Sequence, residues 1–243
     1  MTTKAVAVIA GAGPGTGAAI ARRFAKSYGI ALLARSASSY QPLVQEISSS
    51  GGRAIGISTD VSDGTSVKSA FEQITTAFPG AALAAAVYNV GGWLPSKPFL
   101  QLSEDDFKAG FESNALGAFH FSQAAIPLLL NAGNLQYPPT LIFTGATASF
   151  RGSARLGPFS SGKFALRALS QSLAREFGPE GIHVSHVIVD GVIDTDQTRT
   201  LKAGTPDAKL DPKAIADTYW HLHSQPKSAF TQELDLRPAA EQW

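Results

Sequence analysis

The chain alternates short apolar runs with longer stretches in which apolar residues recur at helical spacing. The short runs are rich in Val, Ile and Ala and lie at about 4–10, 29–34, 53–58, 82–88, 139–145 and 182–189. Most of them lack strict polar alternation, which is typical of strands that helices cover on both faces of a parallel sheet. Helices are expected at 15–28, 66–78, 104–130 and 159–177. This alternation predicts repeated βαβ units.

We therefore expect an α/β fold, with a single doubly wound Rossmann-type domain over residues 1–243. Its sheet should be mostly parallel, with about seven strands and helices on both faces. After residue 192 repeated prolines break the pattern into short pieces. Residues 192–243 are accordingly expected to fold over the sheet edge as a substrate lid and C-terminal extension, with a last strand near 234–236.

Composition narrows the classes of partner. The chain has 20 Lys+Arg against 19 Asp+Glu, so its net charge gives no electrostatic attraction toward nucleic acid or an anionic membrane. It has no cysteine, which excludes disulfides and thiolate chemistry. The N-terminal residues lack a secretory signal pattern, and a cytoplasmic protein is expected. His221 and His223 are only two residues apart, without a carboxylate at ligand spacing, so no metal site is expected.

A glycine-rich turn follows the first predicted strand directly and leads into a predicted helix. This order places backbone N–H groups and a helix N-terminus where they can hold a pyrophosphate. Glycine permits positive φ and a close approach of the anion to the backbone. The alternative is that the glycines merely form a tight turn. The candidate cofactor-binding residues here are Gly11, Gly13, Pro14, Gly15, Thr16 and Gly17.

The spacing Gly11-x-x-x-Gly15-x-Gly17 resembles that of the short-chain dehydrogenase/reductase family, and further motifs match over roughly residues 4–200. The resemblance implies an NAD(P)-dependent oxidoreductase that associates through its long helices into a homodimer or homotetramer. It also assigns adenine to Asp60 and Val61, and the nicotinamide amide to the Ile193 backbone and the Thr195 hydroxyl. Asn89 and Gly91, directly after the fourth strand, resemble the family's Asn-Asn-Ala-Gly motif; both are cofactor-binding candidates, and Asn89 is expected to brace the sheet.

The residues after the second strand indicate which nicotinamide cofactor is preferred. The resemblance puts Arg35 and Ser36 where an Asp or Glu would bind the 2′-hydroxyl of NAD. A guanidinium suits the 2′-phosphate of NADP instead, so NADP(H) is expected rather than NAD(H). The alternative is that Arg35 is an ordinary solvated arginine.

The catalytic positions depart from the resembling family. That family uses a tyrosine for proton transfer, a lysine four residues later, a serine thirteen residues before the tyrosine, and an asparagine that anchors a water relay. The chain keeps Asn114 and Lys163 but has Phe159 and Ala146 at the other two positions. Phenyl and methyl groups cannot donate a proton. Asn114 also has a purely structural reading, because an amide inside a helix can bond a neighbouring carbonyl and fix a kink.

The leading hypothesis is an NADP(H)-binding oxidoreductase that moves hydride to or from a hydrophobic small molecule with a non-standard proton donor. Activated alkenes, imines or quinones would need the least acid help. The alternative is a catalytically inactive NADP-binding scaffold or regulatory protein. The substrate-side candidates are Trp93, Ala146, Thr147 and Phe159, next to the aromatic residues Phe99, Phe150 and Phe164.

A substitute for the missing acid is sought among the nearby hydroxyl groups. The candidates are Thr147, Ser160, Ser161 and Tyr88. Serine and threonine hydroxyls are poor acids without an adjacent base. Asp190 stands where the family usually has proline, which should make the turn less rigid, and Asp194 and Asp196 read either as substrate-facing acids or as exposed loop carboxylates.

Overall fold

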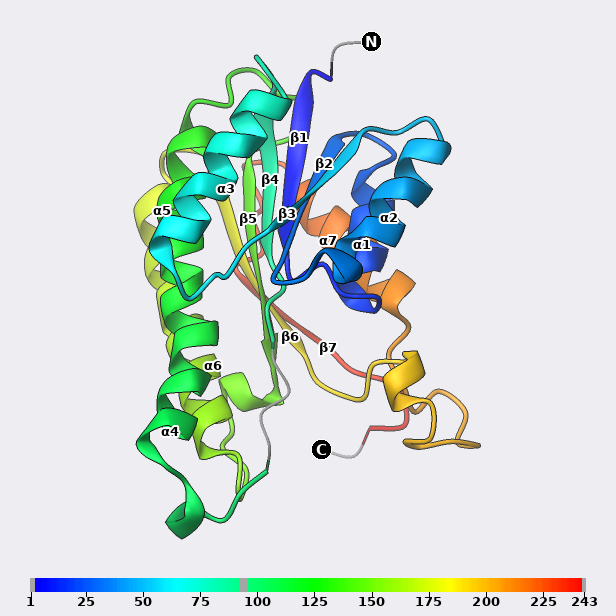
Figure 1. Cartoon of the computed structure of the whole chain (residues 1–243), viewed down its shortest axis with the longest axis vertical. Coiled ribbons are helices and arrows are strands. Elements are labelled where there is room, and N and C mark those ends of the chain that lie inside the picture. Colours follow the sequence, from blue (N-terminus) through cyan, green and yellow to red (C-terminus); the bar gives the residue numbers. More distant parts are fainter. Residues whose placement is uncertain (1–2, 92–95, 242–243) are drawn as a thin grey trace.

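A computed structural model describes residues 3–91 and 96–241. It contains a seven-stranded sheet in the order β3-β2-β1-β4-β5-β6-β7, in which every neighbouring pair is parallel (Figure 1). The predicted fold class is thereby confirmed. The strands are β1 (Ala5–Ala10), β2 (Gly29–Ala34), β3 (Ala54–Ser58), β4 (Ala82–Tyr88), β5 (Thr140–Ala146), β6 (His183–Val189) and β7 (Glu233–Leu236).

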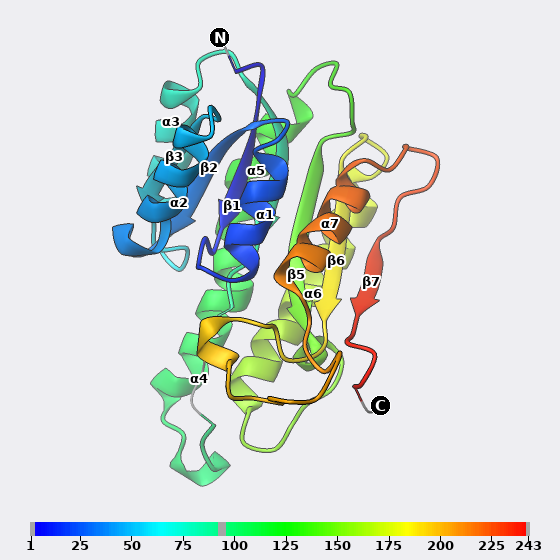
Figure 2. The ribbon, with the colours of Figure 1, turned by 90° about the vertical axis from the view of Figure 1, so that its right-hand side faces the viewer.

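Helices cover both faces of this sheet. The α-helices are α1 (Thr16–Phe24), α2 (Ala37–Ser49), α3 (Gly64–Ala77), α4 (Glu104–Phe111), α5 (Gly117–Leu130), α6 (Gly157–Phe177) and α7 (Pro212–His223). The shorter turns are η1 (Phe99–Gln101), η2 (Glu112–Leu116, a π-turn), η3 (Thr147–Ser149) and η4 (Asp196–Thr198). Helices α1, α2 and α7 lie on one face and α3 to α6 on the other (Figures 1 and 2). None of the helices in the described ranges is both long and apolar enough to span a bilayer.

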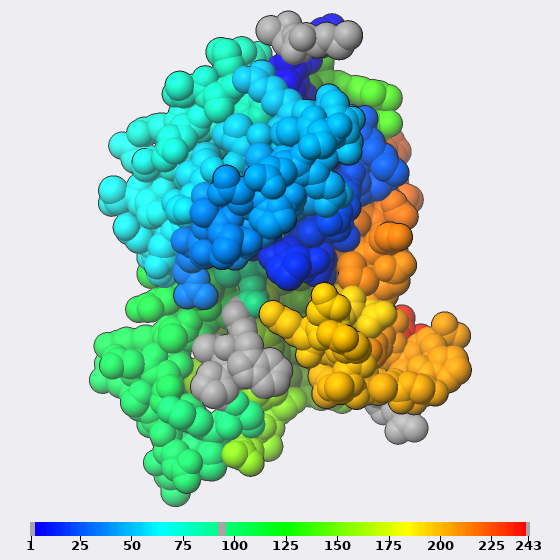
Figure 3. All heavy atoms as spheres, turned by 45° about the vertical axis from the view of Figure 1, so that its right-hand side comes forward, coloured from blue at the N-terminus to red at the C-terminus, as the bar shows by residue number. Residues whose placement is uncertain are grey.

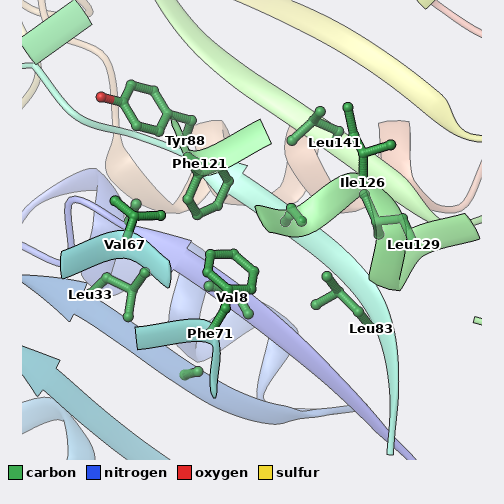
Figure 4. Close-up of a cluster of buried hydrophobic side chains, with 14 of the residues drawn as sticks. Val8, Leu33, Val67, Phe71, Leu83, Tyr88, Phe121, Ile126, Leu129 and Leu141 are labelled. Carbon is green, nitrogen blue, oxygen red and sulfur yellow. The ribbon is translucent and has the colours of Figure 1, made fainter. Parts of the chain in front are cut away.

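Two apolar clusters hold the layers together. One joins the strands to α3, α5 and α6, where Phe71 and Phe121 pack edge to face with ring centroids 5.5 Å apart (Figure 4). The other lies under α1, α2 and α7 and contains Phe24 and Tyr219. Strands β1 and β6 are buried at every position, which explains why their sequences lack polar alternation.

Helices α2 and α7 correct the sequence-based prediction, which placed neither. The prolines after residue 192 predict breaks, but Pro212 occupies the first turn of α7, where proline is favoured, and Asp211 accepts a hydrogen bond from the Lys213 amide as the N-cap. Helix α2 carries Pro42 in its interior and several serines, so its sequence has weak helix propensity. The segment after 192 therefore does not only follow the sheet edge: α7 packs beside α1 on the sheet face (Figure 2).

The strand order reverses direction between β1 and β4, and this places the candidate site. In open parallel sheets ligands bind beyond the carboxyl ends of the strands at such a switch point. Asn89 spans it: its side-chain amide donates to the Gly11 carbonyl at 3.1 Å and accepts from the Thr144 hydroxyl at 3.0 Å. The expectation that Asn89 braces the sheet is confirmed, because it ties together the ends of β1, β4 and β5.

Candidate functional site

In the glycine turn, Gly11 and Gly17 pack tightly against backbone, whereas Gly13 leaves space for a ligand. Gly11 has φ +84°, and a Cβ there would collide with the Asn89 carbonyl group. A Cβ at Gly17 would collide with the Gly11 carbonyl oxygen. By contrast, the Cβ position of Gly13 has no heavy atom within 4 Å. Helix α1 has no acidic side chain in its first turn, so its N-terminus is electrostatically suited to an anion.

The loop after β6 covers this turn. The Thr195 methyl group lies 2.9 Å from the Cβ position of Gly15, so the segment after β6 meets the glycine turn on one face (Figure 3). The Thr195 hydroxyl is 3.1 Å from that of Thr198, which also donates to the Ile193 carbonyl. Both polar groups that the resemblance gave to the nicotinamide amide thus take part in a local turn.

Two acidic residues of this loop, Asp194 and Asp196, face solvent. Asp194 forms an ion pair with Lys209 at 3.1 Å, and its side chain is 62% exposed. Asp196 is fully exposed and 4.0 Å from Arg199. The reading as exposed loop carboxylates therefore describes both residues, and the substrate-facing reading does not.

Arg35 and Ser36 lie together where β2 ends. Arg35 is exposed, and no hydrogen bond or ion pair joins it to another of the described residues. Its charge contributes to lowering the pKa of the Asp60 carboxyl, after the hydrogen bonds from Ser62. Arg22 is not a second free cation, since Glu46 binds it through two hydrogen bonds of 2.6 and 2.8 Å. Ser36 is the N-cap residue of α2.

Lys163 on α6 reaches the carboxyl edge of the sheet and is held there by backbone groups. Its Nζ donates to the Thr144 carbonyl at 2.9 Å and to the Val90 carbonyl at 3.3 Å. The side chain is buried, and this burial lowers the pKa of its ammonium to about 8. The Phe159 ring lies beside it, with its centroid 5.8 Å from Nζ. The amine position therefore depends on two carbonyls and not on residue 159.

Asn114 lies in the π-turn η2, which interrupts the long helix predicted over 104–130. Its Nδ2 donates to the Gly110 carbonyl at 2.9 Å, as the kink-fixing reading requires. Its Oδ1 is buried and has no partner within the described part of the chain. π-turns are frequent at functional sites, and this one leaves a buried amide oxygen available to a water or ligand.

Tyr88 supports this π-turn and is not a substitute acid. Its hydroxyl donates to the Ser113 carbonyl at 2.6 Å, inside η2. The ring is fully buried and packs against Phe121 (Figure 4). It also contacts Phe143, and this burial raises the pKa of its hydroxyl. A buried phenol that already donates to a backbone carbonyl cannot serve a substrate, so this candidate was wrong.

Sequence reasoning missed a polar unit at the ends of β5 and β6. The Thr147 hydroxyl donates to Asp190 Oδ1, and Asp190 Oδ2 lies 2.7 Å from Arg237 Nη1. Arg237 also bonds Asp235 at 3.0 and 2.8 Å. Asp190 is only 4% exposed. The available signal was the replacement of the family's proline by Asp190. That replacement predicts a looser turn. Instead, the Asp190 carboxylate, paired with Arg237, and the Asp190 amide, bonded to the Leu236 carbonyl, tie the end of β6 to the residues around the end of β7.

The remaining candidates lie apart from one another. Ser160 is buried with an unpartnered hydroxyl, whereas Ser161 is exposed. Phe99 and Phe164 are 77% and 43% exposed, so these two aromatic rings do not line an enclosed pocket. Trp93 lies outside the described residues.

Behind the site, the buried His186 of β6 meets a partly exposed ion pair between Arg167 of α6 and Glu233 of β7. His186 Nδ1 is 2.9 Å from Glu233 Oε2, and Arg167 binds the same carboxylate through two bonds of 2.7 Å. Burial lowers the pKa of His186 to about 4 and keeps its ring neutral. Within residues 3–91 and 96–241, no group of three His, Cys, Asp or Glu side chains is arranged to hold a metal ion.

Comparison with known proteins agrees with this geometry. The family model described as short chain dehydrogenase matches residues 5–206. The chain belongs to the short-chain dehydrogenase family. This membership confirms the predicted family and the predicted class, an oxidoreductase of the short-chain dehydrogenase type.

Similar proteins of the family cover nearly the whole chain. An uncharacterized oxidoreductase of Methylorubrum extorquens is 30% identical over 91% of this chain and 85% of its own length. The crystal structure of a short-chain dehydrogenase from Rhodopseudomonas palustris is 33% identical, with a TM-score of 0.81 over 97% of this chain and 99% of that one. An alcohol dehydrogenase from Thermococcus sibiricus, solved with 5-hydroxy-NADP, is 28% identical, with a TM-score of 0.83 over 98% of each chain.

Proposed function

We propose that this short-chain dehydrogenase binds NADP(H) and transfers hydride to or from a hydrophobic small molecule, with a proton donor other than the family's tyrosine. The observation that carries the proposal is the position of Lys163. Its amine is fixed by two backbone carbonyls beside Gly91, at the carboxyl edge of the sheet where the glycine turn also lies. A buried cation is retained there although no phenol remains for it to activate.

The cofactor would be held along this edge. The phosphates would lie on the backbone around Gly13, whose Cβ position is open, and the nicotinamide ribose on Lys163. When bound, the nicotinamide ring supplies or accepts the hydride. The other proposed contacts are Gly11, Pro14, Gly15, Thr16 and Gly17 for the phosphates, Asp60 and Val61 for adenine, and Asn89, Gly91, Ile193 and Thr195 for the nicotinamide half.

NADP(H) is the proposed form of the cofactor. Arg35 is exposed at the end of β2, beside the N-cap Ser36, and nothing acidic occupies the place where NAD would need a carboxylate. Guanidinium groups bind phosphate through paired hydrogen bonds. The structure of the Thermococcus sibiricus relative with 5-hydroxy-NADP supports the same choice.

Phe159 and Ala146 limit the substrates that the site could handle, and they also favour a second function, a protein that binds NADP without turnover. Hydride transfer to a ketone creates an alkoxide, which needs a proton donor and a polarising hydrogen bond that these side chains cannot give. Activated alkenes, imines or quinones would lessen that need, and Ala146, Thr147 and Phe159 would face such a substrate. If the chain does not turn over at all, it acts as an NADP-binding scaffold or regulatory protein.

Calorimetry with NADP⁺, NADPH, NAD⁺ and NADH tests the cofactor proposal. We expect the phosphorylated forms to bind more tightly, and Lys163→Met to weaken all four, with the exposed Lys68→Met as the matched control. Absence of binding at millimolar concentrations would contradict the proposal. A screen of NADPH oxidation with ketones, imines and quinones then separates the enzyme from the scaffold.

Restoring the family's groups is the sharper test of the site. The double variant Phe159→Tyr/Ala146→Ser places a phenol beside the Lys163 amine, whose position does not depend on residue 159. Ketone reduction well beyond that of the parent would show that the missing phenol limits the site. If no such activity appears, the substrate side of the site has itself diverged.

The resemblance and the exposed aromatic residues also support a proposed assembly. Phe107, Phe111, Phe119 and Phe164 on α4, α5 and α6 are 42–47% exposed, which suits the homodimer or homotetramer common in the family. Sedimentation of the parent and of Phe111→Arg tests this. Residues 192–243 are proposed as lid and C-terminal extension of a single domain, and a cytoplasmic location stays a prediction.

A further inference from the structure

The Thr147 and Asp190 pair lies at the carboxyl edge of the sheet, one residue beyond the strand ends. In the parallel pairing of β5 with β6, Ala146 is the partner of Val189, so the next residues of the two strands are also neighbours. Lys163 binds the same end of β5 through the Thr144 carbonyl. The pair therefore adjoins Ala146, the position where the family carries its serine.

In this pair the Thr147 hydroxyl is the group that a substrate can reach, because the Asp190 carboxylate is buried. Asp190 is 4% exposed, and its second oxygen is engaged with Arg237 at 2.7 Å. Thr147 is only half-buried. Because its hydrogen is donated to the carboxylate, the Thr147 oxygen is left with lone pairs that accept a hydrogen bond. A carboxylate beside a hydroxyl is also the adjacent base that an isolated threonine lacks.

The other hydroxyl candidates have no such partner. Tyr88 donates to the Ser113 carbonyl, and the buried Ser160 hydroxyl has no partner in the part of the chain that the structure describes. A carbonyl accepts a hydrogen bond but does not take up a proton at neutral pH. Thr147 is thus the hydroxyl of this set that is joined to a proton acceptor.

We propose that Thr147 and Asp190 form a proton relay that takes over the role of the missing tyrosine, and that the site oxidises a hydrophobic secondary alcohol. This inference rests on the proposed function. The alcohol O–H donates to Thr147 Oγ1, and its proton moves to that oxygen while the Thr147 proton moves to Asp190 Oδ1. The hydride on the alcohol carbon goes to NADP⁺, and the C=O bond forms.

The step balances without a further reactant. An alcohol and NADP⁺ become a ketone and NADPH, and the Asp190 carboxylate takes up one proton that it returns to water. The proton therefore passes from the alcohol to Thr147 and from Thr147 to Asp190, which is the oxidising direction. Arg237 is a positioning residue, since its guanidinium fixes the second carboxylate oxygen.

Calorimetry with 1-phenylethanol on the NADP⁺-loaded protein tests the contact with Thr147. One lost hydrogen bond corresponds to roughly a 3- to 10-fold loss of affinity, so Thr147→Val should bind the alcohol that much more weakly. Thr147→Ser should restore the affinity, and all three proteins should bind NADP⁺ equally. Equal alcohol affinity in the parent and Thr147→Val, including none in either, would overturn the relay.

NADPH formation from NADP⁺ and 1-phenylethanol tests Asp190. Loss of the base should slow hydride transfer in Asp190→Asn by roughly 10²- to 10⁴-fold with alcohol affinity unchanged, while the exposed Asp105→Asn keeps the parent rate. A parent-like rate in Asp190→Asn, or no detectable rate in the parent, would overturn the relay. Asp190→Asn also removes a partner of Arg237, so if it fails to fold, the Thr147 pair decides. Loss of NADP⁺ binding by the parent would instead overturn the proposed function.

Discussion

Gly13→Ala should separate the stability of the fold from the binding of the cofactor. The added Cβ meets no heavy atom within 4 Å, and Gly13 does not have the positive φ that strains an alanine. Replacing glycine at such a position stabilises a protein by about 0.4–1 kcal/mol, through the unfolded state. For a chain of this size that raises Tm by roughly 1–4 °C.

The same methyl group occupies space that the phosphates are proposed to fill. We expect NADP⁺ affinity in calorimetry to fall at least about tenfold, equivalent to about 1.4 kcal/mol, while Tm in scanning calorimetry rises. Gly152→Ala is the matched control: its Cβ position is equally open, but it lies outside the turn, so affinity should not change. Gly17→Ala, whose Cβ collides with backbone, should lose both stability and affinity. Parent-like NADP⁺ affinity in Gly13→Ala would refute the proposed position of the phosphates.

Three further predictions concern cofactor preference, the π-turn and pH. Arg35→Ser should weaken NADP⁺ about tenfold or more and leave NAD⁺ unchanged in calorimetry; equal losses for both would contradict the phosphate contact. Tyr88→Phe leaves the part-buried Ser113 carbonyl without its donor at 2.6 Å and should lower the unfolding free energy by about 0.5–1.5 kcal/mol in urea titrations. Burial lowers the pKa of His186 and His223 to about 4, so the unfolded chain binds more protons between pH 4 and 6.5. Stability should therefore fall as pH drops through that range, by about 3 kcal/mol for each histidine, and a flat profile would refute it.

The sheet was predictable because its strands are buried on both faces and so stand out as apolar runs. The same logic failed for α2 and α7, neither of which the pattern predicts. The prolines after residue 192 indicate breaks, although Pro212 begins α7, and α2 tolerates Pro42 in its interior. Tertiary packing against α1 and the sheet outweighed local propensity there.

Within the site, local patterns were predictable and long-range contacts were not. The glycine turn, Asn114 and Lys163 are each marked by neighbours in the sequence. The partnership of Thr147 with Asp190 joins residues 43 positions apart, and only the register of β5 with β6 makes them neighbours. Likewise, no sequence pattern predicts that the Tyr88 hydroxyl at the end of β4 bonds the Ser113 carbonyl and so supports the π-turn around Asn114.

The retained lysine and the new carboxylate are best understood together. Burial lowers the pKa of Lys163 to about 8, so keeping its ammonium charged at neutral pH costs the fold about 3 kcal/mol. If Lys163 served only to activate a phenol, it would destabilise the fold beside Phe159 without any gain in function. Its hydrogen bonds to Thr144 and Val90 persist without the phenol, which fits a role in holding the cofactor ribose. Proton transfer then has to come from another group at the same strand ends, and Asp190, coupled to Thr147 beside the position of the lost serine, supplies a carboxylate there.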